Sequence, residues 1–189
     1  DDIVLEGHAV EVRLYAEDPA HDFRPSPGSL NHFRMPEENL HLRIDTGVRE
    51  GDEVTMHYDP MIAKIVGWDN DRSGALSHLR HALDQTHVVG TNTNLDFLST
   101  VLGSDGFVKS DLDTNFIQRY GKILFSEKRI IEPETFALAA LSELLWFSEI
   151  REAEVLGSGD PHSPWGLNDG WRLNDRGHIE LSYCFGEVE

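Results

Sequence analysis

The first part of the chain alternates between apolar and polar residues in the manner of a β-strand. Over residues 7–17, valine, leucine and alanine fall on one face and charged or aromatic side chains on the other. This period of two predicts a half-buried strand, which Asp18-Pro19 ends because proline donates no ladder hydrogen bond. A rigid proline-rich turn over 23–28 precedes a second predicted strand over 29–34.

The stretch 41–68 has the pattern of a hairpin with a charged outer face. Residues 42–48 and 61–66 have strand-like apolar spacing, and a turn signal lies between them at 49–52. The opposite face carries Arg43, Asp45, Tyr58, Asp59 and Lys64. An arginine beside a carboxylate on rigid strands suits the stabilisation of an anion. An ordinary solvated sheet face explains the same pattern.

After Trp68 the apolar period becomes helical. A helix is predicted from a stripe formed by Ala75, Leu76, Leu79, Ala82 and Leu83. Asn70 or Asp71 is the expected N-cap, and Gly90 the stop signal beyond its end. A second helix is predicted to begin at a capping-box-like sequence over 93–96 and to stop at Gly103. One short helical turn follows over 116–120.

The last third has a different character. Proline and acidic residues in the first turn predict a long helix over 133–156, whose broad apolar face must be buried. A glycine-rich linker follows, and Trp171 lies in a segment expected to pair with an alternating strand over 179–185. A lone hairpin is not independently stable, so this region is expected to be the beginning of a larger domain.

Composition narrows the classes of function. The chain is 39% hydrophobic and 26% charged, which is typical of a soluble globular protein that buries a core. Its formal net charge of −18 disfavours nucleic-acid binding. The sequence contains no apolar run of membrane-spanning length, and its first residues are not expected to be a signal peptide. A single cysteine, Cys184, fits a reducing compartment.

Sequence motifs for common catalytic sites are absent. The ten histidines are scattered; His78 and His81 are three residues apart without a matching carboxylate, so no metal site is predicted. Cys184 lacks an identifiable base, which argues against a nucleophile. Neither a P-loop nor a dinucleotide fingerprint occurs.

Several motifs together give the first part a family resemblance. In chain order they are Gly7-His8-Ala9-Val10-Glu11-Val12-Arg13, Ala16-Glu17-Asp18-Pro19, Phe23-Arg24-Pro25-Ser26-Pro27-Gly28, Leu42-Arg43-Ile44-Asp45, Tyr58-Asp59-Pro60-Met61-Ile62-Ala63-Lys64 and Gly90-Thr91-Asn92-Thr93-Asn94. Over residues 1–120 the chain resembles the C-terminal domain of biotin carboxylase, a component of biotin-dependent carboxylases.

Motifs at 133–140, 163–165 and 170–174 make the C-terminal part of the chain similar to one region of the α subunit of 3-methylcrotonyl-CoA carboxylase. That region joins the biotin carboxylase to its partner subunit. The resemblance implies an α+β fold, with an antiparallel β-sheet and packed helices, followed by a long helix and the beginning of a small β-barrel. The expected domains are 1–122, the biotin carboxylase C-terminal domain, and 123–189, a partial joining domain with the long helix, a linker and a first hairpin.

The resemblance also implies a role for specific residues. In the family an arginine stabilises the negative charge that develops on biotin during its ATP- and bicarbonate-dependent carboxylation, and Arg43 matches it. Asp45 is expected to orient Arg43, and Trp68 and Arg72 match positions of the biotin carboxylase dimer contact, although ordinary structural roles explain them equally well. Tyr58, Asp59 and Lys64 match the family without an assigned role.

Cofactors and partners follow from the same resemblance. Biotin, ATP and Mg²⁺ or Mn²⁺ belong to the parent enzyme, and none is expected on this piece, which lacks the ATP-grasp module and should be inactive alone. The expected partners are the carboxyltransferase subunit, a second biotin carboxylase and the biotinyl carrier domain. The location would be cytoplasmic in bacteria or the mitochondrial matrix in eukaryotes. Alternatives are a pure subunit-docking module, or the same piece of a propionyl-, geranyl- or acetyl-CoA carboxylase; a pyruvate or urea enzyme is disfavoured by the sequence after residue 130.

Overall fold

The computed structural model describes residues 4–57, 59–125, 132–157, 159 and 178–183. It divides into two units, residues 1–127 and 128–189, and each is described separately below. Tyr58, Trp171 and Cys184, which the sequence singled out, lie outside the described residues.

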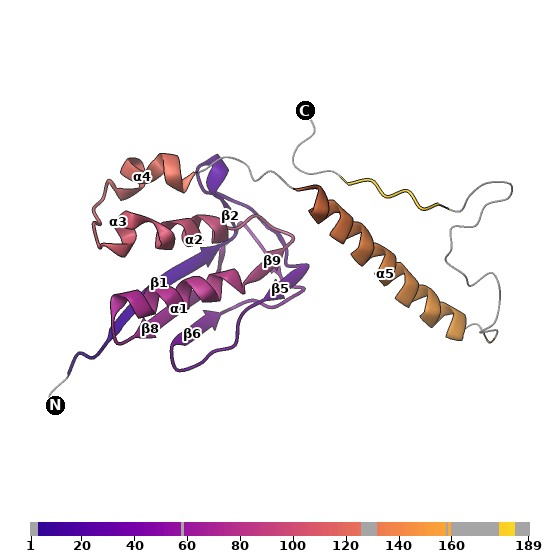
Figure 1. The fold of residues 1–189 in the computed structure, drawn as a ribbon, viewed down its shortest axis with the longest axis horizontal. Coiled ribbons are helices and arrows are strands. Elements are labelled where there is room, and N and C mark those ends of the chain that lie inside the picture. Colours follow the sequence, from indigo (N-terminus) through magenta and orange to yellow (C-terminus); the bar gives the residue numbers. More distant parts are fainter. Residues whose placement is uncertain (1–3, 58, 126–131, 158, 160–177, 184–189) are drawn as a thin grey trace. The chain divides into compact units, whose positions relative to one another are not determined.

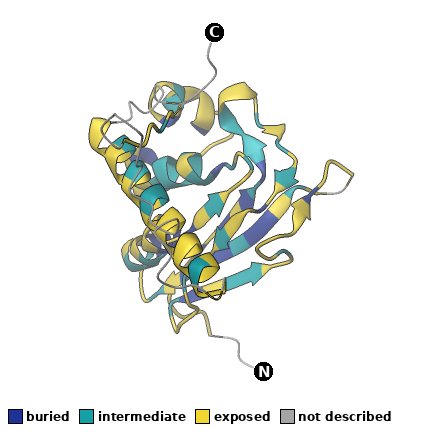
Figure 2. Ribbon diagram, turned by 90° about the vertical axis from the view of Figure 1, so that its right-hand side faces the viewer, coloured by how far each residue is buried: buried dark blue, intermediate teal, exposed yellow. Residues whose placement is uncertain are grey.

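A three-stranded antiparallel sheet forms the centre of the first unit (Figure 1). Strand β8 (Met61–Asp69) lies in the middle, between β1 (His8–Tyr15) and β6 (Leu42–Thr46). The predicted pairing of the stretches 42–48 and 61–66 is therefore confirmed. Buried positions are concentrated along these strands, as Figure 2 shows in dark blue.

Helix α1 (Arg72–Asp84) covers the inner face of the sheet. Asp71 caps it as predicted, because its side chain accepts a hydrogen bond of 2.8 Å from the amide of Gly74. The whole predicted apolar stripe is buried: Ala75, Leu76, Leu79, Ala82 and Leu83. A Cβ atom at Gly67 would lie 2.7 Å from the carbonyl oxygen of Ala75, so this glycine lets the helix approach β8 closely.

The predicted strand over 29–34 is wrong, because the segment changes partners in the middle. It is divided into β4 (Gly28–Ser29), which pairs with β7 (Glu53–Val54), and β5 (His32–Arg34), which pairs with β9 (His87–Val89). Between them, the amide of Leu30 donates to Asp52 and that of Asn31 to Val89. Strand β9 also separates α1 from Gly90, so that glycine does not stop the helix.

Shorter elements complete the unit. Strands β2 (Glu17–Asp18) and β3 (Arg24–Pro25) pair around a 3₁₀ turn, Pro19–His21. Three helices follow β9: α2 (Leu95–Gly103), α3 (Asp105–Val108) and α4 (Phe116–Leu124). Asn94 precedes α2 but makes no side-chain cap. It instead accepts a hydrogen bond of 2.9 Å from the amide of Tyr15 and donates one of 3.2 Å to the carbonyl of Arg13.

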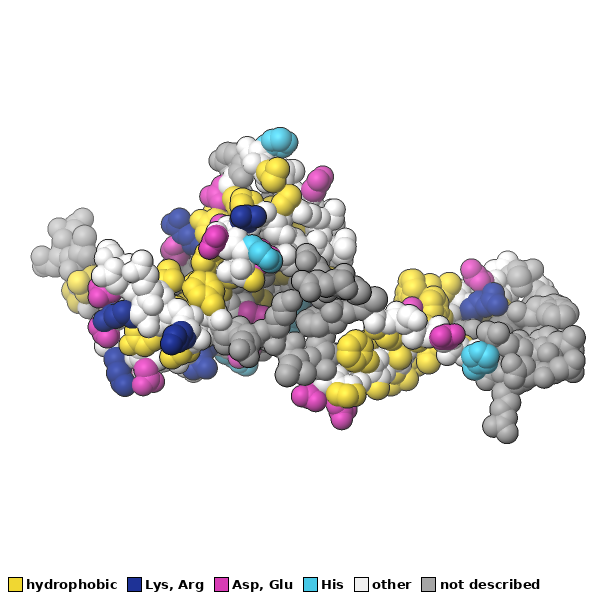
Figure 3. Space-filling model, turned by 90° about the horizontal axis from the view of Figure 1, so that it is seen from above, with side chains coloured by type: hydrophobic (Ala, Val, Ile, Leu, Met, Phe, Trp, Pro, Cys, Tyr) yellow, Lys and Arg dark blue, Asp and Glu magenta, His cyan; other side chains and the backbone are white. Residues whose placement is uncertain are grey.

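The second unit contains the predicted long helix, α5 (Pro133–Gly157), which has no buried residue. Figure 3 shows hydrophobic side chains gathered along it. The strand predicted over 179–185 is not formed at the described positions 178–183. Tyr183 instead donates a hydrogen bond of 2.8 Å to Glu143 of α5. A closed barrel is likewise absent from the described residues.

Candidate functional site

Charged side chains cover the outer face of the central sheet, opposite α1. Their order follows from the register: Arg13 of β1 and Asp45 of β6 both pair with Lys64 of β8. One step along the strands, Glu11 and Arg43 flank Val66 in the same way. Because side chains alternate along a strand, these charges all lie on one face.

Arg43 is the most exposed member, with 72% of its side chain accessible. Its Nε and Nη2 atoms donate to Oδ1 of Asp45 at 3.1 and 3.0 Å. The other carboxylate oxygen of Asp45 lies 2.8 Å from Nζ of Lys64. Asp45 therefore contacts both cations, Arg43 through one carboxylate oxygen and Lys64 through the other.

The two cations keep Asp45 ionised. Its pKa is lowered, first by the hydrogen bond from Lys64 and then by that from Arg43. The guanidinium Nη1 makes no hydrogen bond to a described residue. Arg43 thus offers an oriented donor at a site with two positive charges and one negative, which suits an anion or an oxygen that gains negative charge.

Trp68 and Arg72 lie apart from this cluster. Arg72 is tied inside the unit: its Nη2 donates to the carbonyl of Phe107 at 2.7 Å, its Nη1 lies 3.2 Å from Nε2 of His8, and its guanidinium lies over the Phe107 ring. Trp68 is 37% exposed and stacks against His41. Arg72 accordingly links α1 to β1 and α3, whereas Trp68 presents an aromatic surface to solvent.

The structure also brings together residues that the sequence did not connect. His41, Asp69 and His78 meet at the end of β8, with ligand atoms within 4.8 Å of one another. Their spacing along the chain gives no signal, because the cluster depends on how β6, β8 and α1 are placed. Asp59, by contrast, has a local role, accepting a hydrogen bond of 3.1 Å from the amide of Met61.

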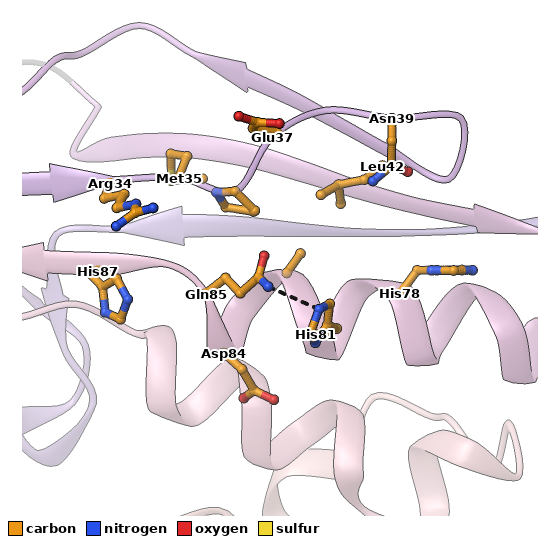
Figure 4. Close-up of a pocket in the computed structure, with 12 residues that line it drawn as sticks. Arg34, Met35, Glu37, Asn39, Leu42, His78, His81, Asp84, Gln85 and His87 are labelled. Carbon is orange, nitrogen blue, oxygen red and sulfur yellow. Dashed lines mark hydrogen bonds between the residues drawn. The ribbon is translucent and has the colours of Figure 1, made fainter.

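A groove of about 670 Å³ runs between α1 and the segment that joins β5 to β6 (Figure 4). Its lining includes His78 and His81 of α1 and Gln85 immediately after the helix, and Gln85 lies 3.0 Å from Nε2 of His81. The groove lies on the side of the sheet that α1 covers, so it is separate from Arg43 and Asp45.

Among the described helices, none combines the length and the apolar composition needed to cross a bilayer.

Comparison with known proteins connects this geometry to one family. Residues 11–119 match the family model of the biotin carboxylase C-terminal domain. The chain is 44% identical to the mitochondrial methylcrotonoyl-CoA carboxylase subunit alpha of Rattus norvegicus over 174 residues, which are 92% of this chain and 24% of the relative. It is 37% identical to the propionyl-CoA carboxylase alpha chain of Ruegeria pomeroyi, covering 85% of this chain and 27% of that one.

A solved structure agrees with the fold. The biotin carboxylase domain dimer of Hydrogenobacter thermophilus 2-oxoglutarate carboxylase, in complex with MgADP, ADP and bicarbonate, superposes with a TM-score of 0.63 at 25% identity. The match covers 67% of this chain and 28% of that one. The chain thus spans about a quarter of the length of these relatives.

Proposed function

Because the chain belongs to the family of biotin carboxylase C-terminal domains, we propose that it is part of the biotin carboxylase component of an acyl-CoA carboxylase. In that role it takes part in the carboxylation of biotin with ATP and bicarbonate. The identity of 44% to a methylcrotonoyl-CoA carboxylase α subunit, against 37% to a propionyl-CoA carboxylase, favours methylcrotonoyl-CoA carboxylase as the parent enzyme. The location of the rat relative favours the mitochondrial matrix if the source is eukaryotic.

The proposal assigns different tasks to two parts of the chain. Residues 1–122 form the biotin carboxylase C-terminal domain, in agreement with a family match that ends at residue 119. Residues 123–189 belong to the region that joins this domain to the carboxyltransferase subunit. ATP and its divalent cation bind in the preceding module of the parent enzyme, so the isolated chain is inactive.

Arg43 carries the proposed chemistry, and its exposed, oriented guanidinium is the observation that supports it. Biotin reaches the site as a substrate on its carrier domain. When its N1 atom loses a proton and attacks carbon dioxide, negative charge develops on the ureido oxygen. A fixed cationic donor at that oxygen lowers the barrier, because its interaction strengthens as the charge grows.

Asp45 and Lys64 prepare Arg43 for this role. Asp45 accepts hydrogen bonds from two guanidinium nitrogens through one oxygen, and Lys64 holds the other oxygen. The guanidinium therefore has little freedom to rotate away from the ligand, and less entropy is lost when the complex forms. Lysine at position 43 would keep the charge but lose the planar fork that makes these contacts.

The test compares Arg43→Lys with Arg13→Lys in a full-length subunit that contains this segment. Arg13 is a matched control, because it lies on the same sheet face and pairs with Glu11 two residues away at 3.1 Å. Loss of one stabilising donor should lower biotin carboxylation by about 10²–10³-fold for Arg43→Lys. Bicarbonate-dependent ATP hydrolysis without biotin should persist. Equal losses in the two variants would show that general surface charge, not Arg43, matters.

A docking role for α5 is the second candidate, and it is compatible with the first. Apolar side chains on this helix are exposed, among them Leu138 at 67%, Leu141 at 53% and Leu145 at 57%. Such a surface marks an interaction site, and we assign it to the carboxyltransferase subunit. Leu141→Asp should abolish co-elution with that subunit, while Ala139→Asp, an equal charge change at an exposed position about 160° around the same helix, should not. Assembly of the Leu141→Asp subunit would contradict this assignment.

Self-association is proposed to involve Trp68, because the related 2-oxoglutarate carboxylase domain is a dimer and Trp68 presents an aromatic surface. Arg72 is a poor probe, since its replacement would break contacts within the unit. Trp68→Ala should shift the full-length subunit towards a smaller species in sedimentation velocity. An unchanged sedimentation coefficient would remove Trp68 from the interface.

A further inference from the structure

Three side chains from separate elements converge where β8 ends. His41 lies immediately before β6, Asp69 is the last residue of β8, and His78 is in the second turn of α1. One nitrogen or oxygen atom of each lies within 4.8 Å of the others, and all three residues are partly buried. Nitrogen Nε2 of His78 is already 3.2 Å from Oδ2 of Asp69.

The tautomer favoured by His41 leaves a nitrogen free for a cation. Its Nδ1 lies 3.2 Å from the carbonyl oxygen of Trp68, a group that only accepts hydrogen bonds. Nδ1 must therefore carry the proton in this contact, and Nε2 keeps its lone pair in the neutral ring. Histidine ligands of metal ions commonly donate a hydrogen bond from the N–H group of their second ring nitrogen to a backbone carbonyl, which fixes the ring orientation.

Asp69 is held in place by its surroundings. Its Oδ1 accepts a hydrogen bond of 2.7 Å from the amide of Asn70, which leaves Oδ2 to face His78. A Cβ atom at Gly74 would overlap this carboxylate, so the glycine provides the space that Asp69 occupies beside α1. The carboxylate is therefore directed at the histidines by its hydrogen bond and by packing.

The histidine rings are also close to each other. The rings of His41 and His78 stack with their centroids 4.3 Å apart and their planes at 10°. Stacked rings direct their nitrogen lone pairs along nearly parallel planes, so one of the two rings must turn out of the stack before both can bind the same cation. The indole of Trp68 stacks beyond His41 at 6.0 Å and limits its movement.

We propose that His41, Asp69 and His78 form a binding site for one divalent transition-metal ion, with Zn²⁺ the best match. Two imidazoles and one carboxylate are ligands that zinc accepts, and three protein ligands leave the fourth position of a tetrahedron to water. Zinc distances of about 2.0–2.1 Å place tetrahedral ligand atoms about 3.3 Å apart. The His78–Asp69 pair is close to this separation, and the third ligand atom would reach it when one of the two stacked rings turns.

The site has a structural role in this proposal. The ion would join the segment before β6, the end of β8 and helix α1, and so add to the hydrogen bonds and apolar packing that already connect these parts. His78 also lines the groove shown in Figure 4, so the open coordination position is accessible from solvent. Magnesium and calcium prefer all-oxygen ligands and should bind this set weakly.

The experiment adds zinc chloride to the metal-free 189-residue chain and follows each histidine ring by ¹⁵N NMR, with calorimetry to measure stoichiometry and affinity. The Nε2 signals of His41 and His78 should move first and saturate at one ion per chain. Magnesium chloride should leave them unchanged. If neither ring responds to zinc before the remaining histidines do, the cluster is an ion pair with stacked rings, and the proposal fails.

Variants provide an independent test. Loss of a residue that only hydrogen-bonds to a metal ligand weakens binding by about 10–100-fold. His78→Gln removes a ligand itself, so it should weaken zinc binding by more than this. His81→Gln is the matched control, since His81 lies on the same helix and contacts only Gln85 among the hydrogen bonds described for it. Equal affinities in the two variants would overturn the proposal, and the NMR experiment on the unmodified chain decides it if His78→Gln fails to fold.

Discussion

The side chain of Asn94 should contribute more to stability than its place beside a helix suggests. The register of β1 on β8 shifts between Leu14 and Tyr15, and there the amide of Tyr15 donates to Asn94 instead of to β8. The Asn94 amide group also donates to the carbonyl of Arg13, and only 6% of the residue is exposed. Asn94→Ala would therefore remove two hydrogen bonds at a place with little access to water.

The cost can be worked out from these two bonds. An orphaned buried donor costs about 1–3 kcal/mol, and a lost bond to an acceptor with a second lone pair about 0.5–1.5 kcal/mol. The free energy of unfolding should accordingly fall by about 1.5–4.5 kcal/mol. Urea unfolding measures this change, and amide hydrogen exchange of Tyr15 locates it.

Asn92→Ala is the matched control. Asn92 is exposed and lies two residues away, so its replacement should change the free energy of unfolding by less than about 0.5 kcal/mol. The prediction is refuted if the two variants have equal urea midpoints and hydrogen exchange at the Tyr15 amide is unchanged. Asn94 would then not be the residue that stabilises the register shift by accepting the hydrogen bond from Tyr15.

Three further predictions concern the core, the cap and the charged face. Leu79→Ala, at a fully buried position, should cost about 2–5 kcal/mol in urea unfolding. Asp71→Ala should cost about 0.5–2 kcal/mol, while Asp71→Asn should restore most of it because the amide oxygen still caps α1. Lys64→Met should raise the pKa of Asp45, measured by ¹³C NMR of the carboxyl group, since Lys64 is the main cause of its depression. The stability that the lowered pKa contributes is present above the unfolded pKa of about 3.9. This stability is lost as pH falls through the pKa of Asp45 in the folded protein. The free energies of unfolding of the wild type and Lys64→Met should therefore become more alike in acid.

The sequence predicted elements whose signals are local. Strict alternation predicted β1. The cap and the apolar stripe of α1 were predicted from a spacing in which each residue is at most four positions from the next. The strand over 29–34 was wrong because its apolar pattern cannot report a change of partners at Leu30. The helix start over 93–96 is confirmed, since α2 begins at Leu95, but the contact of the Asn94 side chain with Tyr15 was not predicted, because the two residues are 79 positions apart.

The charged face was partly predictable. Arg43 and Asp45 are two residues apart on one strand, so alternation alone places them on the same face. The contact of Lys64 with Asp45 needed the register of β6 on β8, which no short-range pattern determines. The helix α5 was predicted correctly, but its burial was not, because an apolar face indicates that a partner is needed without showing where it lies.

The histidine cluster shows how a site can arise from packing without a motif. The apolar stripe that includes Leu79 fixes the rotation of α1 on the sheet, and His78, about 100° away around the helix, is then directed to the end of β8. Gly74 admits the carboxylate of Asp69, and the register of β6 brings His41 beside Trp68. Each of these conditions is set by core packing, so a change such as Gly74→Ala should displace Asp69 and weaken zinc binding while leaving all three ligands in the sequence.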